Sequence, residues 1–297
     1  MNILLTGATG YVGRNLISYL VNSSDHKLFA ITRREVELDS KVVVIKDDDN
    51  LEDEIIKLQP DIVIHLASYL TARSEVNDIH QLINANITFG TLLLNALQKV
   101  KIKCFINVGS FSEYHFSDGN LNPTYLYAAT KTAFRSILNY YAALNNFKVV
   151  HVIPYTIYGG QDTQKKIIDI LFDAIHATEP VKISEGLQYL DFIYISDLIN
   201  FFHKLIDGFE KIDHNDVLHL GTGKVHNLRE VAAKIEEITH SKLKLDWGAY
   251  PPRLRDTVYA NAPIGKLKIL LNWEPEITLE KGLILKYKQL QNGYSER

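Results

Sequence analysis

The sequence predicts an α/β protein with a doubly wound parallel sheet and a smaller, mostly C-terminal domain. In the first half, short apolar runs rich in β-branched residues alternate with longer helical stretches. This alternation is typical of a parallel sheet, because a parallel connection needs a crossover. Runs such as Ile62-Val63-Ile64 show little polar alternation, as expected for a sheet covered on both faces. After Gly160 the pattern loosens into helices joined by short strands and Pro/Gly turns.

The elements of the first half follow one another in the order strand, helix, strand. The expected strands are Asn2–Thr6, Lys27–Thr32, 41–45, 61–66, 103–108 and 148–153, and the expected helices are 11–22, Leu51–Leu58, 76–100 and 124–144. In the second half the expected helices are 163–177, 196–207, Leu228–Thr239 and 279–291. The apolar run 217–220, followed by Gly221-Thr222-Gly223, is expected as one more buried strand. Its return to the main sheet would make the division between the domains discontinuous.

Composition excludes several classes of protein. The chain has 297 residues and a net charge of −3, so no basic surface indicates a nucleic-acid partner. Its one cysteine, Cys104, excludes an intramolecular disulfide and a multi-cysteine metal site, and no histidine or carboxylate spacing indicates another metal site. The apolar runs have the length of strands, and the N-terminus lacks the pattern of a signal peptide. We therefore expect a cytoplasmic protein without a membrane segment.

A glycine loop directly follows the first strand and opens a helix. Gly7 permits a tight turn, Gly10 allows a pyrophosphate to approach the backbone, and Gly13 allows close packing of helix on strand. The N–H groups and dipole at the start of the helix favour an anion. This context predicts a Rossmann-like dinucleotide site, with residues 1–158 and 192–226 forming the dinucleotide-binding domain and 159–191 and 227–297 the second, substrate domain.

The end of the second strand selects the cofactor. An NAD site usually has an acidic residue there to bind the ribose 2′-OH, whereas this chain has Thr32, Arg33 and Arg34. A guanidinium can bind a 2′-phosphate with two hydrogen bonds. We therefore expect NADP(H) in preference to NAD(H). The alternative is that both arginines are surface charges and that Glu35 binds the ribose.

A tyrosine and a lysine lie four residues apart on an expected helix. Tyr127 and Lys131 would share one helix face, where the ammonium should lower the pKa of the phenol and make it a proton donor near neutral pH. Ser110 follows the strand before this helix, at the edge where open α/β sheets bind ligands. This serine could hydrogen-bond a carbonyl oxygen beside Tyr127.

Taken together, the motifs resemble an extended short-chain dehydrogenase/reductase that acts on nucleotide-diphosphate sugars. The motifs are TGATGYVG, His65-Leu66-Ala67-Ser68, NVGSFSEY, YAATK, the segment 185–198 and Asn272-Trp273-Glu274-Pro275. The resemblance covers essentially the whole chain. It implies that Tyr127 is the acid/base, that Lys131 holds the nicotinamide ribose and that Ser110 polarises the sugar carbonyl. In this family the helices 83–100 and 126–144 pair across a twofold axis, which implies a homodimer.

The same resemblance implies the remaining contacts. The cofactor would be held by Gly7, Thr9, Gly10, Tyr11, Val12, Gly13, Thr32, Arg33, Arg34, Leu66, Ala67, Ser68, Tyr127, Lys131, Pro154 and Thr156. The substrate would be held by Ser110, Ser112, Thr156, Lys165 and Arg253. The arginine that many relatives carry in the substrate-domain motif is Leu190 here, so the diphosphate contact is expected from Arg253, Arg255 or Lys165.

Departures from the family pattern narrow the reaction. The 4,6-dehydratases carry Asp-Glu after the active-site serine or threonine, where this chain has Phe111 and Ser112. The runs FAITRR, SEGLQ, DFIYI and VYANA resemble the 4-ketoreductases that make CDP-abequose and CDP-paratose. This implies NADPH-dependent reduction of the C4 ketone of a nucleotide-linked 4-keto-6-deoxy or 3,6-dideoxy sugar, in deoxysugar biosynthesis for surface polysaccharide such as O-antigen. An NAD-dependent nucleotide-sugar epimerase and a non-catalytic NADP-sensing protein are the alternatives.

Overall fold

The computed structural model describes residues 1–48, 50–115, 119–160, 165–251 and 253–295. Within these residues, a seven-stranded sheet forms the larger part of the molecule, with the strand order β10-β6-β5-β4-β1-β2-β3 and parallel pairing throughout. The strands are β1 (Asn2–Thr6), β2 (Lys27–Thr32), β3 (Val42–Lys46), β4 (Ile62–His65), β5 (Cys104–Val108), β6 (Lys148–Pro154) and β10 (Asp216–Leu220). The predicted strand near 217–220 therefore does return to the main sheet, beside β6.

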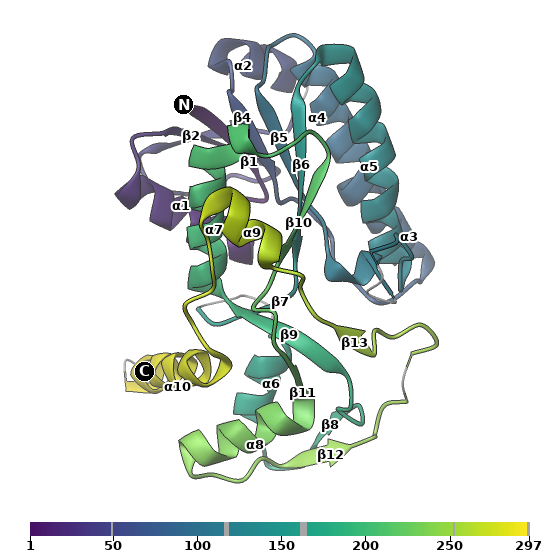
Figure 1. Cartoon of the computed structure of the whole chain (residues 1–297), viewed down its shortest axis with the longest axis vertical. Helices are drawn as coiled ribbons and strands as arrows, with labels where there is room; N and C mark the ends of the chain where they lie inside the picture. The colour runs from purple at the N-terminus through teal and green to yellow at the C-terminus, as the bar shows by residue number, and fades with distance from the viewer. Residues whose placement is uncertain (49, 116–118, 161–164, 252, 296–297) are drawn as a thin grey trace.

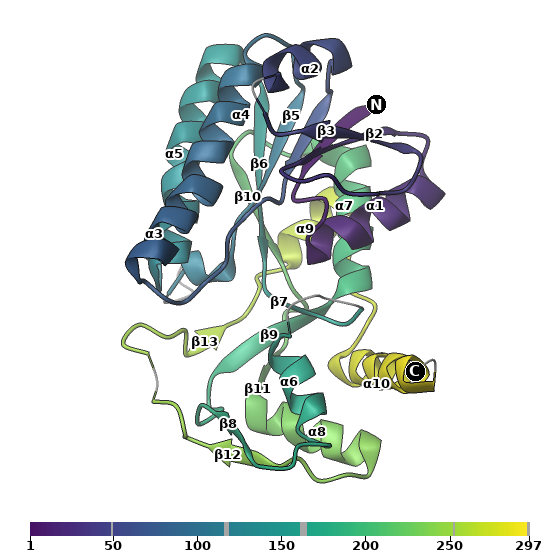
Figure 2. The ribbon, with the colours of Figure 1, turned by 180° about the vertical axis from the view of Figure 1, so that it is seen from behind.

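Helices cover both faces of this sheet, as a doubly wound fold requires (Figures 1 and 2). One face carries α1 (Tyr11–Ser23) and α7 (Ile195–Gly208), and the other carries α2 (Leu51–Leu58), α4 (Phe89–Leu97) and α5 (Leu126–Asn145). The alternation of side chains along β1 explains the two cores. Ile3 and Leu5 pack with α1 and α7, while Leu4 packs on the opposite face.

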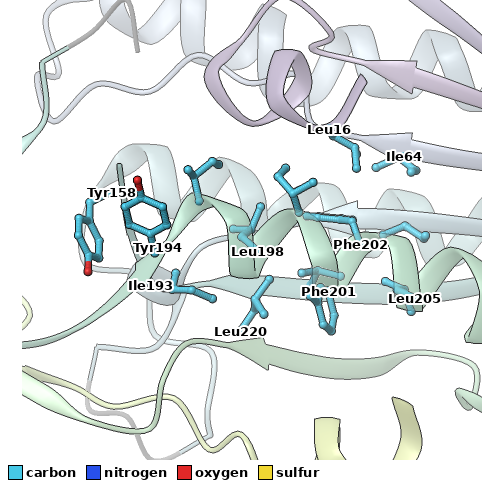
Figure 3. Packing of buried hydrophobic residues seen from close by; sticks show 14 of the residues in the cluster. Leu16, Ile64, Tyr158, Ile193, Tyr194, Leu198, Phe201, Phe202, Leu205 and Leu220 are labelled. Atoms are coloured by element: carbon cyan, nitrogen blue, oxygen red, sulfur yellow. The ribbon is translucent and has the colours of Figure 1, made fainter. Parts of the chain in front are cut away.

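Helix α7 is the most completely buried helix in this packing. Phe201 and Phe202 have no exposed surface. Figure 3 shows Leu198, Phe202 and Leu205 of α7 between the strands and the neighbouring helix α1. Cys104 is also fully buried, as expected for a small core residue.

The smaller part of the molecule lies beyond the carboxyl ends of the main strands. Its sheet contains β11 (Val225–Asn227), β9 (Tyr189–Tyr194) and β13 (Tyr259–Ala260), with β7 (Thr156–Tyr158) also paired to β9. A two-stranded sheet pairs β8 (Val181–Ile183) with β12 (Leu245–Trp247). The helices here are α6 (Ile167–Asp173), α8 (Leu228–Thr239) and α10 (Leu279–Ser295), while α9 (Gly265–Leu271) packs against α7 (Figure 1).

Two predicted helices differ from the structure. The expected helix 163–177 is the shorter α6, and its expected start at Thr163 lies outside the described residues. The expected helix 76–100 is α3 (Val76–Ile83), a π-helical turn at Asn84–Thr88 and α4. Inside the π turn, the buried Asn86 side chain accepts from the backbone N–H of Tyr69 at 2.8 Å and donates to its carbonyl at 3.1 Å. Tertiary hydrogen bonds of this kind cannot be read from helical periodicity.

Candidate active site

The glycine loop between β1 and α1 is built as its sequence predicted. Gly7 has a φ of +70°, and a Cβ there would lie 2.7 Å from the backbone of Leu66 and Ala67. A Cβ on Gly13 would lie 2.2 Å from the Gly7 carbonyl oxygen, so only glycine allows helix and loop to approach this closely. No side chain caps the start of α1 at Gly10. The helix terminus is therefore open to an anionic ligand.

A cavity of about 610 Å³ opens beside this loop. It lies at the carboxyl edge of the sheet, where β4 returns to the other side of β1 after β3, which is the point at which such sheets bind ligands. Its volume and uncapped glycine loop fit a dinucleotide. The lining includes eight of the predicted cofactor residues, namely Gly7, Thr9, Gly10, Thr32, Arg33, Leu66, Ala67 and Ser68. Arg34 is outside the lining, and its carbonyl accepts a hydrogen bond from Thr32 at 3.0 Å.

Asp47 is a lining residue that the sequence analysis did not assign. It follows β3, and its backbone N–H donates to the Thr32 carbonyl at 2.9 Å. Burial raises the pKa of Asp47, while the nearby charge of Arg33 lowers it. A carboxylate and a guanidinium thus line the same end of the cavity. The sequence could have indicated that Asp47 and Arg33 lie close together, because one follows β3, the other follows β2, and the carboxyl ends of parallel strands meet at one edge of a sheet.

The Tyr127 and Lys131 side chains lie on α5 and are both buried, with 7% and 4% of their surface exposed. The expectation that Lys131 lowers the pKa of Tyr127 does not hold here. Burial raises the pKa of Tyr127 well above its ordinary value, opposed by a hydrogen bond with Ser68. Burial also lowers the pKa of Lys131 to about 8, although Glu113 raises it. Desolvation is the largest cause of both shifts, so the Tyr127 phenol stays protonated at neutral pH.

Ser110 stands at the end of β5, at the start of a short 3-10 turn over Phe111–Glu113. Its backbone N–H donates to Glu113 Oε1 at 2.9 Å. The other oxygen, Glu113 Oε2, accepts from Arg135 Nε at 2.9 Å and from the Thr132 hydroxyl at 3.1 Å. Glu113 has no exposed surface, and Arg135 donates further to the Tyr114 phenol at 3.0 Å. This buried ion pair holds the loop that carries Ser110, and the sequence analysis did not identify it.

Two of the predicted substrate residues, Ser112 and Arg253, act on the Tyr125 side chain. Ser112 Oγ is 2.8 Å from Ser110 Oγ. Burial raises the pKa of Tyr125, and Ser112 opposes this rise. The Tyr125 ring stacks on that of Tyr127, with the two ring centroids 5.7 Å apart. The charge of Arg253, in the smaller part of the molecule, acts on the Tyr125 phenol. A serine and an arginine that the sequence analysis assigned to the substrate are therefore brought to the same tyrosine from different parts of the molecule.

The sequence of this chain matches a family model for the NAD-dependent epimerase/dehydratase family over residues 3–221. This chain belongs to that family. The family resemblance inferred from the motifs is thereby confirmed.

Individual family members agree with this assignment. The chain is 30% identical to CDP-abequose synthase of Yersinia pseudotuberculosis over 254 residues, which is 84% of this chain and 89% of that protein. It is 28% identical to CDP-abequose synthase of Salmonella muenchen over 293 residues, which is 95% of each chain. A structure of UDP-glucuronic acid 4-epimerase from Bacillus cereus in complex with UDP-glucuronic acid and NAD matches with a TM-score of 0.89 at 23% identity, over 99% of this chain and 100% of that one. The structural match confirms the fold.

Three other residues predicted for the site are Pro154, Thr156 and Lys165. Pro154 ends β6, and Thr156 begins β7, where it is paired in register with Phe192 of β9. Lys165 is exposed and forms an ion pair with Asp173 at 2.5 Å. Among the described residues there is no cluster of histidine, cysteine or carboxylate groups that could hold a metal ion. Across the same residues, every helix is too short or too polar to span a bilayer.

Proposed function

We propose that this protein reduces the C4 ketone of a nucleotide-diphosphate 4-keto-6-deoxy or 3,6-dideoxy sugar, with NADPH as the reductant. The 30% identity to a CDP-abequose synthase over 84% of the chain carries this proposal, because that protein's name assigns it to a nucleotide-linked deoxysugar. Phe111 and Ser112, which stand where dehydratases of the family carry an acid and a base, argue against water elimination. Such a reduction belongs to deoxysugar biosynthesis for a surface polysaccharide.

The bound nicotinamide would supply a hydride to C4 of the sugar. The matching proton comes from the Tyr127 phenol and goes to the carbonyl oxygen, so the ketone becomes an alcohol. The raised pKa of Tyr127 keeps this proton in place until negative charge develops on the oxygen. The Ser110 hydroxyl donates a hydrogen bond to the same oxygen, which stabilises that charge before the proton arrives.

The task proposed for Lys131 is to hold the nicotinamide ribose, as the family resemblance implies, and not to lower the pKa of Tyr127. Its buried ammonium lies one helical turn beyond Tyr127 and is kept charged near neutral pH partly by Glu113. The geometry supports a role in holding the nicotinamide ribose and in stabilising the phenolate that remains after proton transfer. Both roles need the charged form of the side chain.

The choice of NADP(H) depends on the end of β2. Arg33 lines the cavity and can bind a 2′-phosphate with two hydrogen bonds, which supports NADP(H). Asp47 lines the same end, and its carboxylate would repel that phosphate unless Arg33 lies between the two groups. NAD(H) remains the alternative, since the matching Bacillus cereus epimerase structure contains NAD.

A nucleotide-sugar 4-epimerase is the second candidate function. The observation that favours it is the TM-score of 0.89 to the UDP-glucuronic acid 4-epimerase. Epimerisation would use the same Ser110, Tyr127 and Lys131. It differs in that the cofactor is regenerated within each turnover and is not consumed.

We also propose a homodimer and a nucleotide-sugar contact formed by Ser112, Thr156, Lys165 and Arg253. Support for the dimer comes from α4 and α5, whose outer faces expose the apolar side chains of Leu92, Tyr140 and Leu144 at 60%, 62% and 56%. An apolar stripe of this kind is unusual on a monomer.

The deciding experiment incubates the purified protein with a panel of nucleotide-diphosphate 4-keto-6-deoxy sugars and either NADPH or NADH. The expected result is stoichiometric loss of NADPH absorbance and a product two mass units heavier than the ketone. An epimerised product without net cofactor consumption would replace this function by the second candidate. Binding of NADPH without any turnover would contradict both.

A further inference from the structure

An apolar cluster lies directly beside Ser110, at the carboxyl edge of the main sheet. Phe111, the next residue along the chain, stacks its ring on that of Tyr155, with the two ring centroids 5.5 Å apart and an interplanar angle of 21°. Ser110 follows β5, and Tyr155 follows β6, which is the neighbouring parallel strand. The cluster therefore begins at the edge where open α/β sheets bind ligands.

The smaller part of the molecule supplies the other half of this cluster. Leu190 of β9 and Ala260 of β13 are register partners, and both strands lie beyond the carboxyl ends of the main strands (Figure 1). Phe111 and Leu190 pack against the same buried group, which includes Tyr155 and Ala260. We call the surface formed by Phe111, Tyr155, Leu190 and Ala260 the apolar wall. It joins both parts of the molecule next to Ser110.

The apolar wall has one polar side chain, that of Tyr155. Its phenol oxygen is 3.3 Å from His219 Nδ1 and so already has a partner within the protein. Phe111 stands where the dehydratases of the family carry an acid, and Leu190 stands where many relatives carry an arginine. Both side chains are half-buried, so part of each remains accessible beside Ser110. Two positions at which relatives place a charge are therefore apolar here, and they belong to one surface.

The proposed reaction determines which carbons of the sugar lie near this wall. Ser110 and Tyr127 both bind the oxygen on C4, so a side chain next to Ser110 lies near the adjacent carbons C3 and C5, and near C6, which is attached to C5. A hydroxyl pressed against an apolar surface loses its hydrogen bonds to water and gains none in return. A methylene or methyl group at the same place gains from burial. The wall should therefore favour a sugar that lacks these hydroxyls.

We propose that Phe111 and Leu190 determine the specificity of the site, and that they select a 3,6-dideoxy sugar over sugars that carry a hydroxyl at C3 or C6. The inference rests on the proposed ketone reduction, which places C4 at Ser110. The buried Tyr155 and Ala260 support the two side chains from behind. An apolar site of this kind discriminates against one added hydroxyl by up to about 100-fold.

A pair of substrates that differ in one hydroxyl tests the inference. The pair is the nucleotide-diphosphate 4-keto-6-deoxy sugar and its 3-deoxy counterpart, and wild-type kcat/KM should be about 10- to 100-fold higher for the 3-deoxy member. Phe111→Asn and Leu190→Asn should each lower this ratio about fivefold or more, because the amide can hydrogen-bond the hydroxyl. Phe111→Leu is the matched control, since leucine and asparagine are nearly equal in size, and it should keep the wild-type ratio. A ratio between two substrates does not depend on the fraction of enzyme that is folded.

Equal kcat/KM values for the two keto sugars, or a preference that Phe111→Asn keeps as fully as Phe111→Leu, would overturn the inference and leave the proposed function intact. If the wild type reduces no ketone, the proposed function fails, and calorimetric titration with CDP-glucose and CDP-6-deoxyglucose decides the inference. The wild type should then bind CDP-6-deoxyglucose about tenfold more tightly than CDP-glucose, and Phe111→Asn should bind the two alike. Equal wild-type affinities, or no binding of either compound, would refute it.

Discussion

Glu113→Gln should destabilise the protein strongly, although the two side chains are nearly equal in size. The Glu113 carboxylate has no exposed surface and accepts from Ser110, Thr132 and Arg135. A glutamine keeps one oxygen acceptor, but its amide would present N–H groups to the Arg135 guanidinium. The guanidinium would then be left buried without its counter-charge, and breaking a buried pair in this way costs about 3–5 kcal/mol.

Urea denaturation followed by far-UV circular dichroism measures this loss. The midpoint should fall while the slope m stays at the wild-type value, because the native fold is retained. Combining Glu113→Gln with Arg135→Met removes the unpaired guanidinium. The double variant should recover a good part of the lost free energy of unfolding. Glu54→Gln is the control, since Glu54 pairs with Lys57 on the surface and its loss should leave the urea midpoint near the wild-type value. A Glu113→Gln variant within about 1 kcal/mol of wild type would refute the reasoning, because the buried pair would then be energetically neutral.

Four further predictions concern the site and the assembly. Tyr127→Phe should lower kcat by about 10²–10⁴ while NADPH affinity, measured by fluorescence titration, stays within a factor of about two; full turnover would reject its role as proton donor. Activity should fall as the pH rises through about 8, because the buried Lys131 ammonium, with its pKa lowered to about 8, is charged only below that pH; a rate that stays flat to pH 9.5 is incompatible with a need for this charge. Arg33→Ala should raise KM for NADPH about tenfold and leave KM for NADH nearly unchanged, whereas equal effects would assign the arginine no phosphate contact. Leu144→Glu should convert a dimer into a monomer in light scattering with chromatography, and a wild type that is already monomeric would contradict the dimer.

The sequence predicted the architecture well because the fold depends on signals that are local and periodic. Apolar runs, glycine spacing and helix length were enough to predict the parallel sheet, the glycine loop and the return of β10 to the main sheet. The Tyr127–Lys131 spacing also placed both groups correctly on one helix. Their burial could not be predicted in the same way, because it depends on residues such as Leu82 that approach from α3. The predicted direction of the pKa shift of Tyr127 was therefore wrong, because the pKa rises and does not fall.

The parts of the site that escaped prediction are long-range polar contacts. From the sequence, Glu113 looks like an ordinary charged residue in a serine-containing loop. Its partner Arg135 is 22 positions away, on a helix. From the sequence, Asp47 looks like part of a solvated acidic run, yet it directly follows β3, and the neighbouring strand β2 directly precedes Arg33. For Asp47 and Arg33 the strand ends were a signal, but only the order of the strands shows that β2 and β3 are neighbours. Nothing in the sequence pairs Glu113 with Arg135.

The π turn at Asn84–Thr88 changes which residues the long helix before β5 can present to its neighbours. One extra residue in a helical turn rotates everything after it by about 100°, because an α-helix has 3.6 residues per turn. Leu82 before the turn contacts the Tyr127 end of α5, whereas Leu93 and Leu94 after it face the sheet core. Shortening the turn by one residue would therefore put the two halves of the helix out of phase. Either Leu82 would lose its contact with Tyr127, or Leu93 and Leu94 would turn away from the sheet core.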